Sequence, residues 1–268
     1  MVYFPNAKVN LGLYVTEKRK DGYHNLVSVM LPVAWCDMLE VVSANKFTYS
    51  QSGLTIPGKE ADNLCVKAYK LLNKDFQLGP VHIHLHKIIP MGAGLGGGSA
   101  DAAFTLKALN QHFQLYLDNS ILEDYAAQLG SDCSFFIENK PALATGRGEI
   151  LSPINLDLSG YHILLVNPQI AVGTAEAYKG VRPQAMDFDL AQFLSETPME
   201  QWNEQLRNDF EESVFAKYPE IAQLKVQLYE AGASYASMSG SGSTVFGIFK
   251  ELPAISFPDN YMIWQGKL

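Results

Sequence analysis

The feature that most constrains this chain is a glycine-rich segment, Pro90–Ala103 (PMGAGLGGGSADAA), which lies between a strand pattern and a helix pattern. Over Val81–Ile89, apolar residues alternate with three histidines, as in a half-buried strand. Over Ala100–Asn110, apolar residues recur at helical spacing. Glycine lets a ligand approach the backbone closely, and N–H groups at a helix N-terminus attract anions. The order strand, glycine loop, helix therefore predicts a site for phosphate groups.

Two better-known glycine motifs are alternatives. A Walker A loop ends in Gly-Lys-Ser/Thr, and Gly98-Ser99 lacks the lysine. The dinucleotide fingerprint G-x-G-x-x-G is matched over Gly92–Gly97, and Asp118 lies about twenty residues further on, where a ribose-binding acid is expected. The intervening segment Phe113–Leu117 is too short and ambiguous to be assigned as the required second strand. A dinucleotide-dependent oxidoreductase is therefore the less favoured alternative.

The three histidines before the loop form a separate pattern. His82, His84 and His86 share one face of the predicted strand. Zinc-bound histidines usually have carboxylates behind them, and no Asp or Glu lies nearby in the sequence. We therefore interpret this face as the solvent side of the strand and predict no metal site.

Charge and cysteine content exclude several classes of protein. Lys and Arg number 20 against 28 Asp and Glu, a net charge of −8 that disfavours nucleic acid and anionic membranes as partners. Cys36, Cys65 and Cys133 are far apart and include no C-x-x-C pair, which predicts neither a disulfide framework nor a zinc site and suggests the cytoplasm. Lys8 interrupts the first apolar stretch, so we expect no signal peptide, and we predict no transmembrane helix.

Strand and helix patterns are mixed along the whole chain. Strands are predicted over Lys8–Val15 and Leu26–Val33, joined by a hairpin loop at Glu17–Gly22. The pattern changes near Ser152, after which a buried strand and several helices follow. We predict an α+β protein with two domains, residues 1–153 and 154–268. Further strands are predicted over 38–42, 47–50, 142–145, 150–151, 161–167 and 244–249, and helices over 64–73, 121–129, 175–178, 210–215 and 220–230.

A second glycine loop lies near the end of the chain. Met238–Thr244 (MSGSGST) comes between a predicted helix and a predicted buried strand. Serine and glycine runs are more often linkers, but a linker is not expected at such a place. We therefore expect this loop to assist the first one.

These motifs together resemble the GHMP kinases, the family of galactokinase, homoserine kinase, mevalonate kinase and phosphomevalonate kinase. The two glycine loops resemble the phosphate loop and the C-terminal glycine motif of that family. The segments Asn6–Leu11 (NAKVNL), Asp21–Leu26 (DGYHNL) and Gly130–Phe136 (GSDCSFF) are similar to the branch that phosphorylates the 2-hydroxyl of 4-diphosphocytidyl-2-C-methyl-D-erythritol in the non-mevalonate pathway to isoprenoids. The resemblance spans nearly the whole chain. It departs from the branch at Ala100, Cys133 and Ser134, none of which removes a charged group.

The resemblance implies a fold, an activity and residue roles. The implied fold is a ribosomal-protein-S5-domain-2-like domain followed by a ferredoxin-like one, and the implied reaction is ATP-dependent and uses Mg²⁺, with Ser99 as a candidate metal ligand. Lys8 and Asp132 are the implied catalytic pair: the aspartate accepts the proton of the acceptor hydroxyl, and the lysine keeps it ionised. The implied ATP-binding residues are Pro90, Met91, Gly92, Ala93, Gly94, Leu95, Gly96, Gly97, Gly98, Ser99, Asn63 and Lys87.

The implied acceptor is a small molecule ending in cytidine diphosphate, and its implied ligands are Asn10, Tyr23, His24, Arg147, Thr174 and Tyr178. In this interpretation Tyr23 stacks on cytosine, His24 bonds its edge and Tyr178 closes the other face. From the residues alone, a hairpin cap is the favoured explanation of Tyr23 and His24, and only the resemblance reverses it. A helix cap and a strand end explain Asn63 and Lys87 nearly as well as nucleotide binding does. Another GHMP kinase and an inert nucleotide-binding module remain alternatives. We expect a monomer or a weak homodimer.

Overall fold

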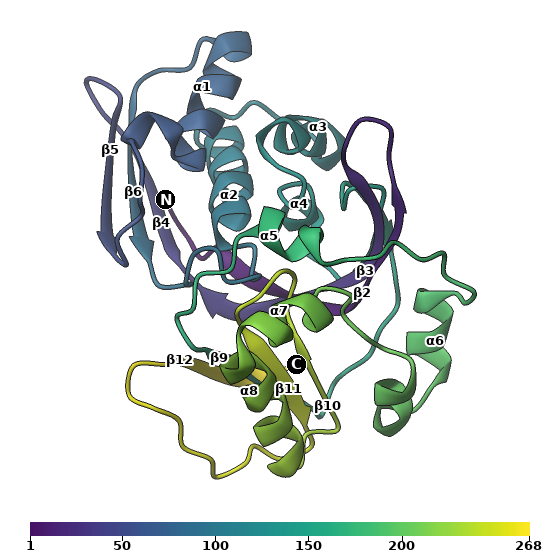
Figure 1. The fold of residues 1–268 in the computed structure, drawn as a ribbon. Coiled ribbons are helices and arrows are strands. Elements are labelled where there is room, and N and C mark those ends of the chain that lie inside the picture. The colour runs from purple at the N-terminus through teal and green to yellow at the C-terminus, as the bar shows by residue number, and fades with distance from the viewer. The chain divides into compact units, whose positions relative to one another are not determined.

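The alternating and β-branched segments of the sequence form three four-stranded sheets in the computed structural model, which describes residues 1–268 (Figure 1). The sheet orders are β1-β4-β6-β5, β2-β3-β7-β8 and β10-β11-β9-β12. The strands are β1 (Val2–Tyr3), β2 (Asn6–Lys18), β3 (His24–Cys36), β4 (Met38–Ser43), β5 (Thr48–Gly53), β6 (Val81–Lys87), β7 (Ala142–Thr145), β8 (Ile150–Pro153), β9 (His162–Asn167), β10 (Tyr235–Met238), β11 (Val245–Phe249) and β12 (Met262–Lys267).

The helices are distributed over both halves of the chain, which confirms the predicted α+β class. They are α1 (Leu64–Phe76), α2 (Gly97–His112), α3 (Asn119–Leu129), α4 (Phe135–Glu138), α5 (Thr174–Lys179), α6 (Leu190–Glu196), α7 (Glu211–Lys217) and α8 (Pro219–Glu230), with 3-10 helices η1 (Glu60–Asp62) and η2 (Met199–Glu204). None of the helices has the length and apolar character that crossing a membrane requires.

Two compact units are built from interleaved segments. The first unit contains residues 1–7, 34–91 and 96–140. The second contains residues 8–33, 92–95 and 141–268. Neither unit is one continuous stretch of chain, and the boundary at residue 153 predicted from the sequence remains a proposal about family domains.

The first unit places a helical layer on one face of the sheet β1-β4-β6-β5. Leu39 and Val41 of β4 and Ile83 and Leu85 of β6 are fully buried on that face. Helix α2 packs against β4 and also against α1, α3 and α4. Its buried face is rich in alanine, whose small side chains let these neighbours approach closely.

The opposite face of this sheet carries the histidine row, the face that the sequence predicts to be on the solvent side. The three histidines are half-buried, and their ring nitrogens contact hydroxyl oxygens of Thr48, Ser50 and Ser52 on the parallel neighbour β5 at 2.8–3.1 Å. These contacts arise because β5 lies in register beside β6, a pairing that the sequence of β6 alone does not reveal.

The second unit contains the other two sheets and the helices α5–α8. Helix α8 packs on β10 and β11. Its buried residues join a core cluster that includes Val166 of β9. Leu13 and Val15 of β2 belong to the same cluster, so the strand from the start of the chain and the C-terminal elements share one core.

Candidate active site

The first glycine loop leads from β6 into helix α2, which begins at Gly97. Gly96 caps the helix in the left-handed conformation, with φ 69° and no side-chain cap. Ser99 therefore lies in the first turn of the helix, not directly before the helix as the sequence pattern predicted. The N–H of Ala100 bonds the carbonyl of Gly96 at 2.9 Å, whereas the preceding N–H groups precede the intrahelical ladder and can face a ligand.

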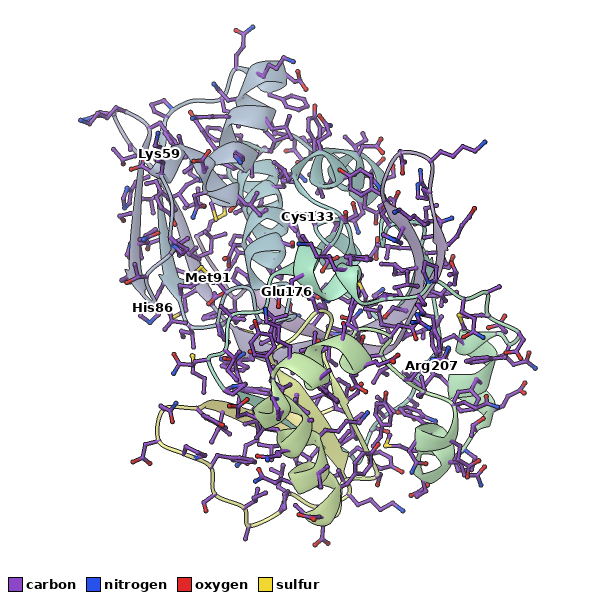
Figure 2. All side chains as sticks on the ribbon, in the orientation of Figure 1. Lys59, His86, Met91, Cys133, Glu176 and Arg207 are labelled. Carbon is purple, nitrogen blue, oxygen red and sulfur yellow. The ribbon has the colours of Figure 1, made fainter.

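The loop is anchored by its two apolar residues. Ala93 and Leu95 are buried, whereas Gly92 and Gly98 are exposed. Pro90 is buried, and the side chain of Met91 is 37% exposed (Figure 2). The anchors fix the loop, and the exposed glycines leave its backbone accessible to a ligand.

The second glycine loop lies directly on the first. The hydroxyl of Ser239 donates to the carbonyl oxygen of Gly94 at 2.8 Å, and the N–H of Thr244 donates to that of Ala93 at 3.3 Å. A Cβ on Gly94 would lie 1.8 Å from the carbonyl oxygen of Ser239, and φ there is 78°. Contact with the second loop therefore requires glycine at this position.

The second loop connects two paired strands. β10 and β11 are antiparallel, with Met238 opposite Val245, so the loop closes a hairpin. The sequence analysis placed this loop between a helix and a strand, because it missed β10.

Lys8 is joined to the first loop by backbone and is oriented by its neighbours. Its N–H donates to the carbonyl of Leu95 at 2.9 Å, and its buried ammonium donates to Oδ1 of Asn10 at 2.6 Å. The amide nitrogen of Asn10 donates to the hydroxyl of Ser28 at 2.8 Å, and Ser28 donates to the carbonyl of Gly12 at 2.6 Å. This chain of bonds fixes the direction of the lysine side chain.

Asp132 lies in the first unit, between α3 and α4 along the chain. It precedes Cys133, a buried residue at the turn before α4 (Figure 2). Burial raises the pKa of the Cys133 thiol to about 12; the hydroxyl of Ser99 lowers it by hydrogen bonding, and the Asp132 carboxylate raises it. The Ser99 hydroxyl and the Asp132 carboxylate therefore both act on the Cys133 thiol. Lys8 belongs to the second unit, so its pairing with Asp132 remains a proposal.

The residues predicted to bind the acceptor all lie in the second unit, where two pairs of them are in contact. The rings of His24 and Tyr178 are stacked with centroids 4.8 Å apart and an interplanar angle of 18°. The guanidinium of Arg147 lies 5.0 Å from the ring centroid of Tyr23, which is 57% exposed. The hydroxyl of Thr174 is 3.3 Å from that of Ser241 in the second loop. The stacked rings of His24 and Tyr178 form one wall, which we call the acceptor wall, and their contacts with the acceptor remain a proposal.

Asn63 caps helix α1, the role that the residue pattern alone predicted. Its Oδ1 accepts the N–H of Cys65, and its amide donates to the hydroxyl of Tyr49, both at 2.9 Å. Both polar atoms of the Asn63 side chain therefore have hydrogen-bond partners within the protein.

Lys87 lies beneath the first glycine loop. Its ammonium contacts the carboxylates of Asp37 and Asp101, each at 2.6 Å, and its side chain is 1% exposed. Burial alone would lower the pKa of Lys87, but the carboxylates raise it above the ordinary value. A Cβ on Gly97 would lie 3.0 Å from this ammonium. The lysine predicted to bind ATP thus supports the start of α2 from below.

The dinucleotide alternative is contradicted by the structure. Asp118 caps helix α3 by accepting the N–H of Ile121 at 3.0 Å, and no strand forms over residues 113–117. Asp118, the acid that the dinucleotide-binding motif needs for the ribose, instead caps a helix.

Comparison with known proteins agrees with the motifs. The model of the GHMP kinases N terminal domain matches residues 63–139, and that of the GHMP kinases C terminal domain matches residues 190–257. The 4-diphosphocytidyl-2-C-methyl-D-erythritol kinase of Bacteroides thetaiotaomicron (strain ATCC 29148) is 51% identical over the full length of both chains. The chain belongs to this family of GHMP kinases. The enzyme of the same name from Bacteroides fragilis (strain ATCC 25285) is 53% identical over 93% of this chain and 92% of its own.

A solved structure of the family is similar in fold. A crystal structure of 4-(cytidine 5'-diphospho)-2C-methyl-D-erythritol kinase matches with a TM-score of 0.78 and 34% identity, over 92% of this chain and 89% of the other. Both the suspected family and the expected GHMP kinase fold are therefore confirmed.

Sequence reasoning missed several residues that support the site of this GHMP kinase. The sequence does contain a sign of the acidic partners of Lys87. This lysine continues the buried face of β6 after Val81, Ile83 and Leu85, and a buried lysine needs a buried acid beside it. No sequence pattern points to Asn208 and Glu211, which bind the backbone of the second loop.

Proposed function

We propose that this protein transfers the γ-phosphoryl group of ATP to the 2-hydroxyl of 4-diphosphocytidyl-2-C-methyl-D-erythritol. The observation that carries the proposal is the full-length, 51% identical relative with this activity in its name. The site supports it, because one unit holds Lys8 against the first glycine loop and also holds the stacked rings of His24 and Tyr178.

Phosphoryl transfer mainly requires positioning and charge stabilisation. The exposed glycines and the N-terminal turn of α2 bind the phosphates of ATP. The Asp132 carboxylate accepts the proton of the acceptor hydroxyl, the hydroxyl oxygen bonds to the γ-phosphorus, and ADP leaves with the electrons of the broken P–O bond. Lys8, held by Asn10, stabilises the charge on the reacting oxygen.

Mg²⁺ fits this site as an ion carried mainly by the nucleotide. The chain has no group of three or more His, Cys, Asp or Glu side chains arranged for a metal. Mg²⁺ in kinases is commonly held by one or two protein ligands together with phosphates and waters. Ser99 and Asp132, both next to Cys133, are the residues that would hold it. When bound, the ion neutralises phosphate charge during transfer.

The acceptor wall suits a nucleotide base with charged phosphates. Tyr23 offers an exposed ring for stacking, and the Arg147 guanidinium above it suits a diphosphate. We also propose that the protein works in the cytoplasm as a soluble enzyme, since its three cysteines are free.

The proposal is tested by ADP release in a coupled assay. The wild-type protein should turn over with the cytidine diphosphate alcohol and not with mevalonate or homoserine. Asp132→Asn should lower kcat at least a hundredfold, within the range of ~10²–10⁴ for a general base, and retain ATP binding. Turnover on mevalonate or homoserine would favour another GHMP kinase, and ATP binding without any turnover in the wild type would favour an inert module.

A further inference from the structure

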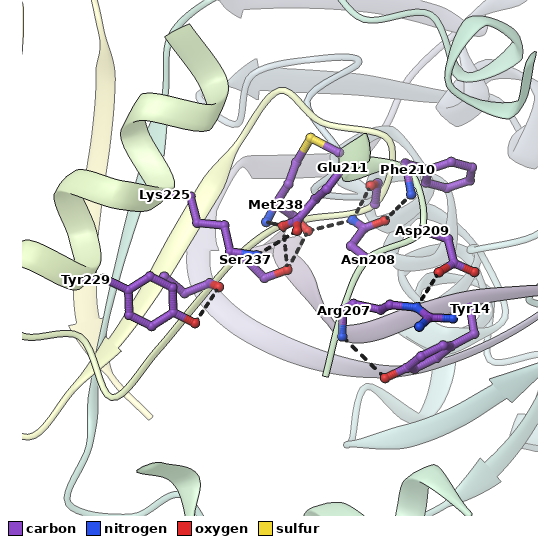
Figure 3. Close-up of polar contacts among 12 residues, drawn as sticks. Tyr14, Arg207, Asn208, Asp209, Phe210, Glu211, Lys225, Tyr229, Ser237 and Met238 are labelled. Atoms are coloured by element: carbon purple, nitrogen blue, oxygen red, sulfur yellow. Dashed lines mark hydrogen bonds and ion pairs between the residues drawn. The ribbon is translucent and has the colours of Figure 1, made fainter. Parts of the chain in front are cut away.

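The turn Asn208–Glu211 lies at the base of the second glycine loop and is not part of any predicted site (Figure 3). The side-chain amide of Asn208 donates to the carbonyl of Met238 at 2.8 Å and to that of Gly240 at 2.7 Å. Oδ1 of the same side chain accepts the N–H of Phe210 at 3.0 Å. Asn208 is buried, so each of these bonds replaces one to water.

Glu211 binds the same strand end from the other side. Its Oε1 accepts the N–H of Met238 at 2.8 Å and the hydroxyl of Ser237 at 3.0 Å. Lys225 neutralises the carboxylate through a 2.6 Å ion pair. The turn therefore holds both backbone groups of Met238, the residue from which the second loop begins.

Through the loop, the turn reaches the nucleotide side of the site. The loop lies on Gly94 through the bond from Ser239, and a Cβ on Gly240 would be 3.3 Å from the Cα of Gly94. If the carbonyls of Met238 and Gly240 lost the Asn208 amide as their donor, the second loop would lose two bonds that hold it in position against Gly94.

On its other side, the turn supports the acceptor wall and the strand of Lys8. The ring of Phe210 packs edge-on against Tyr178, with centroids 4.8 Å apart. The N–H of Asp209 donates to the carbonyl of Leu13 on β2 at 2.8 Å, and the N–H of Leu13 donates to the carbonyl of Arg207 at 2.9 Å. One turn thus contacts the second glycine loop, the acceptor wall and the strand of the catalytic lysine.

We propose that Asn208 is a positioning residue for phosphoryl transfer: it sets the second glycine loop on Gly94 while its own turn holds Tyr178 through Phe210. The inference rests on the proposed function. It assigns Asn208 no contact with either substrate, and predicts that nucleotide and acceptor binding both depend on this one carboxamide.

Asn208→Asp tests the donor specifically. The substituted side chain has nearly the same size and still accepts the N–H of Phe210, but it places a carboxylate oxygen against the carbonyl oxygens of Met238 and Gly240. We expect KM to rise for both substrates and kcat/KM to fall by about tenfold to a hundredfold, the effect of leaving a buried acceptor without its donor. A role confined to stability would reduce the amount of active protein and leave both KM values unchanged.

The neighbouring residue provides a matched control. Asp209→Asn replaces a carboxylate by an amide, the reverse of the change at Asn208. The Asp209 carboxylate accepts the N–H of Val15 at 2.8 Å and pairs with Arg207 at 2.9 Å, and neither contact involves the second loop. It should leave both KM values within about twofold of the wild type, since its bonds do not touch the glycine loops. Phe210→Leu, which removes the ring under Tyr178, should raise KM for the acceptor and leave KM for ATP unchanged.

The outcomes separate the inference from the proposed function. If the wild type turns over and Asn208→Asp keeps both KM values, only the inference is contradicted. If Asn208→Asp is insoluble, two other variants test the inference. An unchanged KM for ATP in Ser239→Ala, or an unchanged KM for the acceptor in Phe210→Leu, would overturn it. If the wild type does not turn over, the proposed function fails. The inference is then still tested by calorimetric Kd values for ADP: Asn208→Asp should weaken ADP binding, and Asp209→Asn should not.

Discussion

At the scale of single residues, Gly94 is the position where a single methyl group should do most harm. A Cβ there would lie 1.8 Å from a backbone oxygen of the second loop, on a residue with φ 78°. Gly94→Ala should lower the free energy of unfolding by several kcal/mol, because strain adds to the ~1–2 kcal/mol of the left-handed conformation. Urea unfolding measures the loss.

Gly232→Ala separates the two contributions to that loss. Gly232 also has a positive φ, 93°, but no atom lies within 4 Å of a Cβ built there. Its variant should show only the cost of the left-handed conformation, about 1–2 kcal/mol. Equal losses at the two positions would show that the second loop does not press on Gly94.

Asn10 tests how Lys8, the proposed catalytic lysine, is oriented. Its carboxamide connects the ammonium of Lys8 to Ser28. Asn10→Ala should lower kcat about tenfold by releasing one charge-assisted bond worth ~1.5–3 kcal/mol, with little change in KM for ATP. Steady-state kinetics measure both. Asn119→Ala truncates an exposed asparagine and is the control, and a normal kcat in Asn10→Ala would contradict this role.

At the scale of secondary-structure elements, the buried ions under α2 should make stability depend on pH. Two carboxylates share the one ammonium of Lys87, and burial raises the pKa of Asp101 to about 7, a rise that the ammonium opposes. The folded state therefore binds the proton of Asp101 more tightly than the unfolded state, whose carboxyl titrates near pH 4. This contribution to stability is complete below about pH 4 and is lost as the pH rises towards 7.

Asp101→Asn removes this titration. Between pH 4.5 and pH 7.5, the wild type should lose roughly 3 kcal/mol more unfolding free energy than Asp101→Asn, since each pKa unit corresponds to about 1.4 kcal/mol. Urea unfolding of both proteins at the two pH values measures the difference. Parallel losses in the two proteins would show that Asp101 has an ordinary pKa in the fold.

The elements that the sequence predicted well are those with a pattern of their own. The alternation over β6 and the helical spacing of α1 and α2 were sufficient, with ends misplaced by only a few residues. Strand β10 (YASM) was missed because all four residues are buried, which leaves no alternation, and its register is set by β11. Helix α6, which has seven residues, was also missed.

The same distinction applies to the site. The glycine loop was predicted from its own composition, and the acceptor residues from motif resemblance. Asn208 and Glu211 act on backbone groups of Met238, about thirty residues along the chain, and such contacts leave no trace in the spacing of side chains.

At the scale of the whole molecule, the interleaving of the chain determines which fragments can fold. The segment 8–33 belongs to the same compact unit as residues 154–268, although the predicted domain boundary separates them. Leu13 and Val15 lie in the core cluster of the C-terminal elements, and Leu13 pairs with Arg207 and Asp209 through backbone bonds. Burying two such side chains contributes about 3–6 kcal/mol, a large part of the ~5–15 kcal/mol that stabilises a whole protein.

A chain divided after residue 153 tests this view. Residues 154–268 expressed alone lack β2 and should melt without a cooperative transition, because the cluster around Val166 is then open to water. Co-expression with residues 1–153 should restore β2 and give a complex that purifies as one species and melts cooperatively near the temperature of the intact chain. Circular dichroism against temperature measures both. A sharp transition in the isolated C-terminal fragment would mean that its core is complete without Leu13 and Val15, and that the predicted boundary also separates independent folding units.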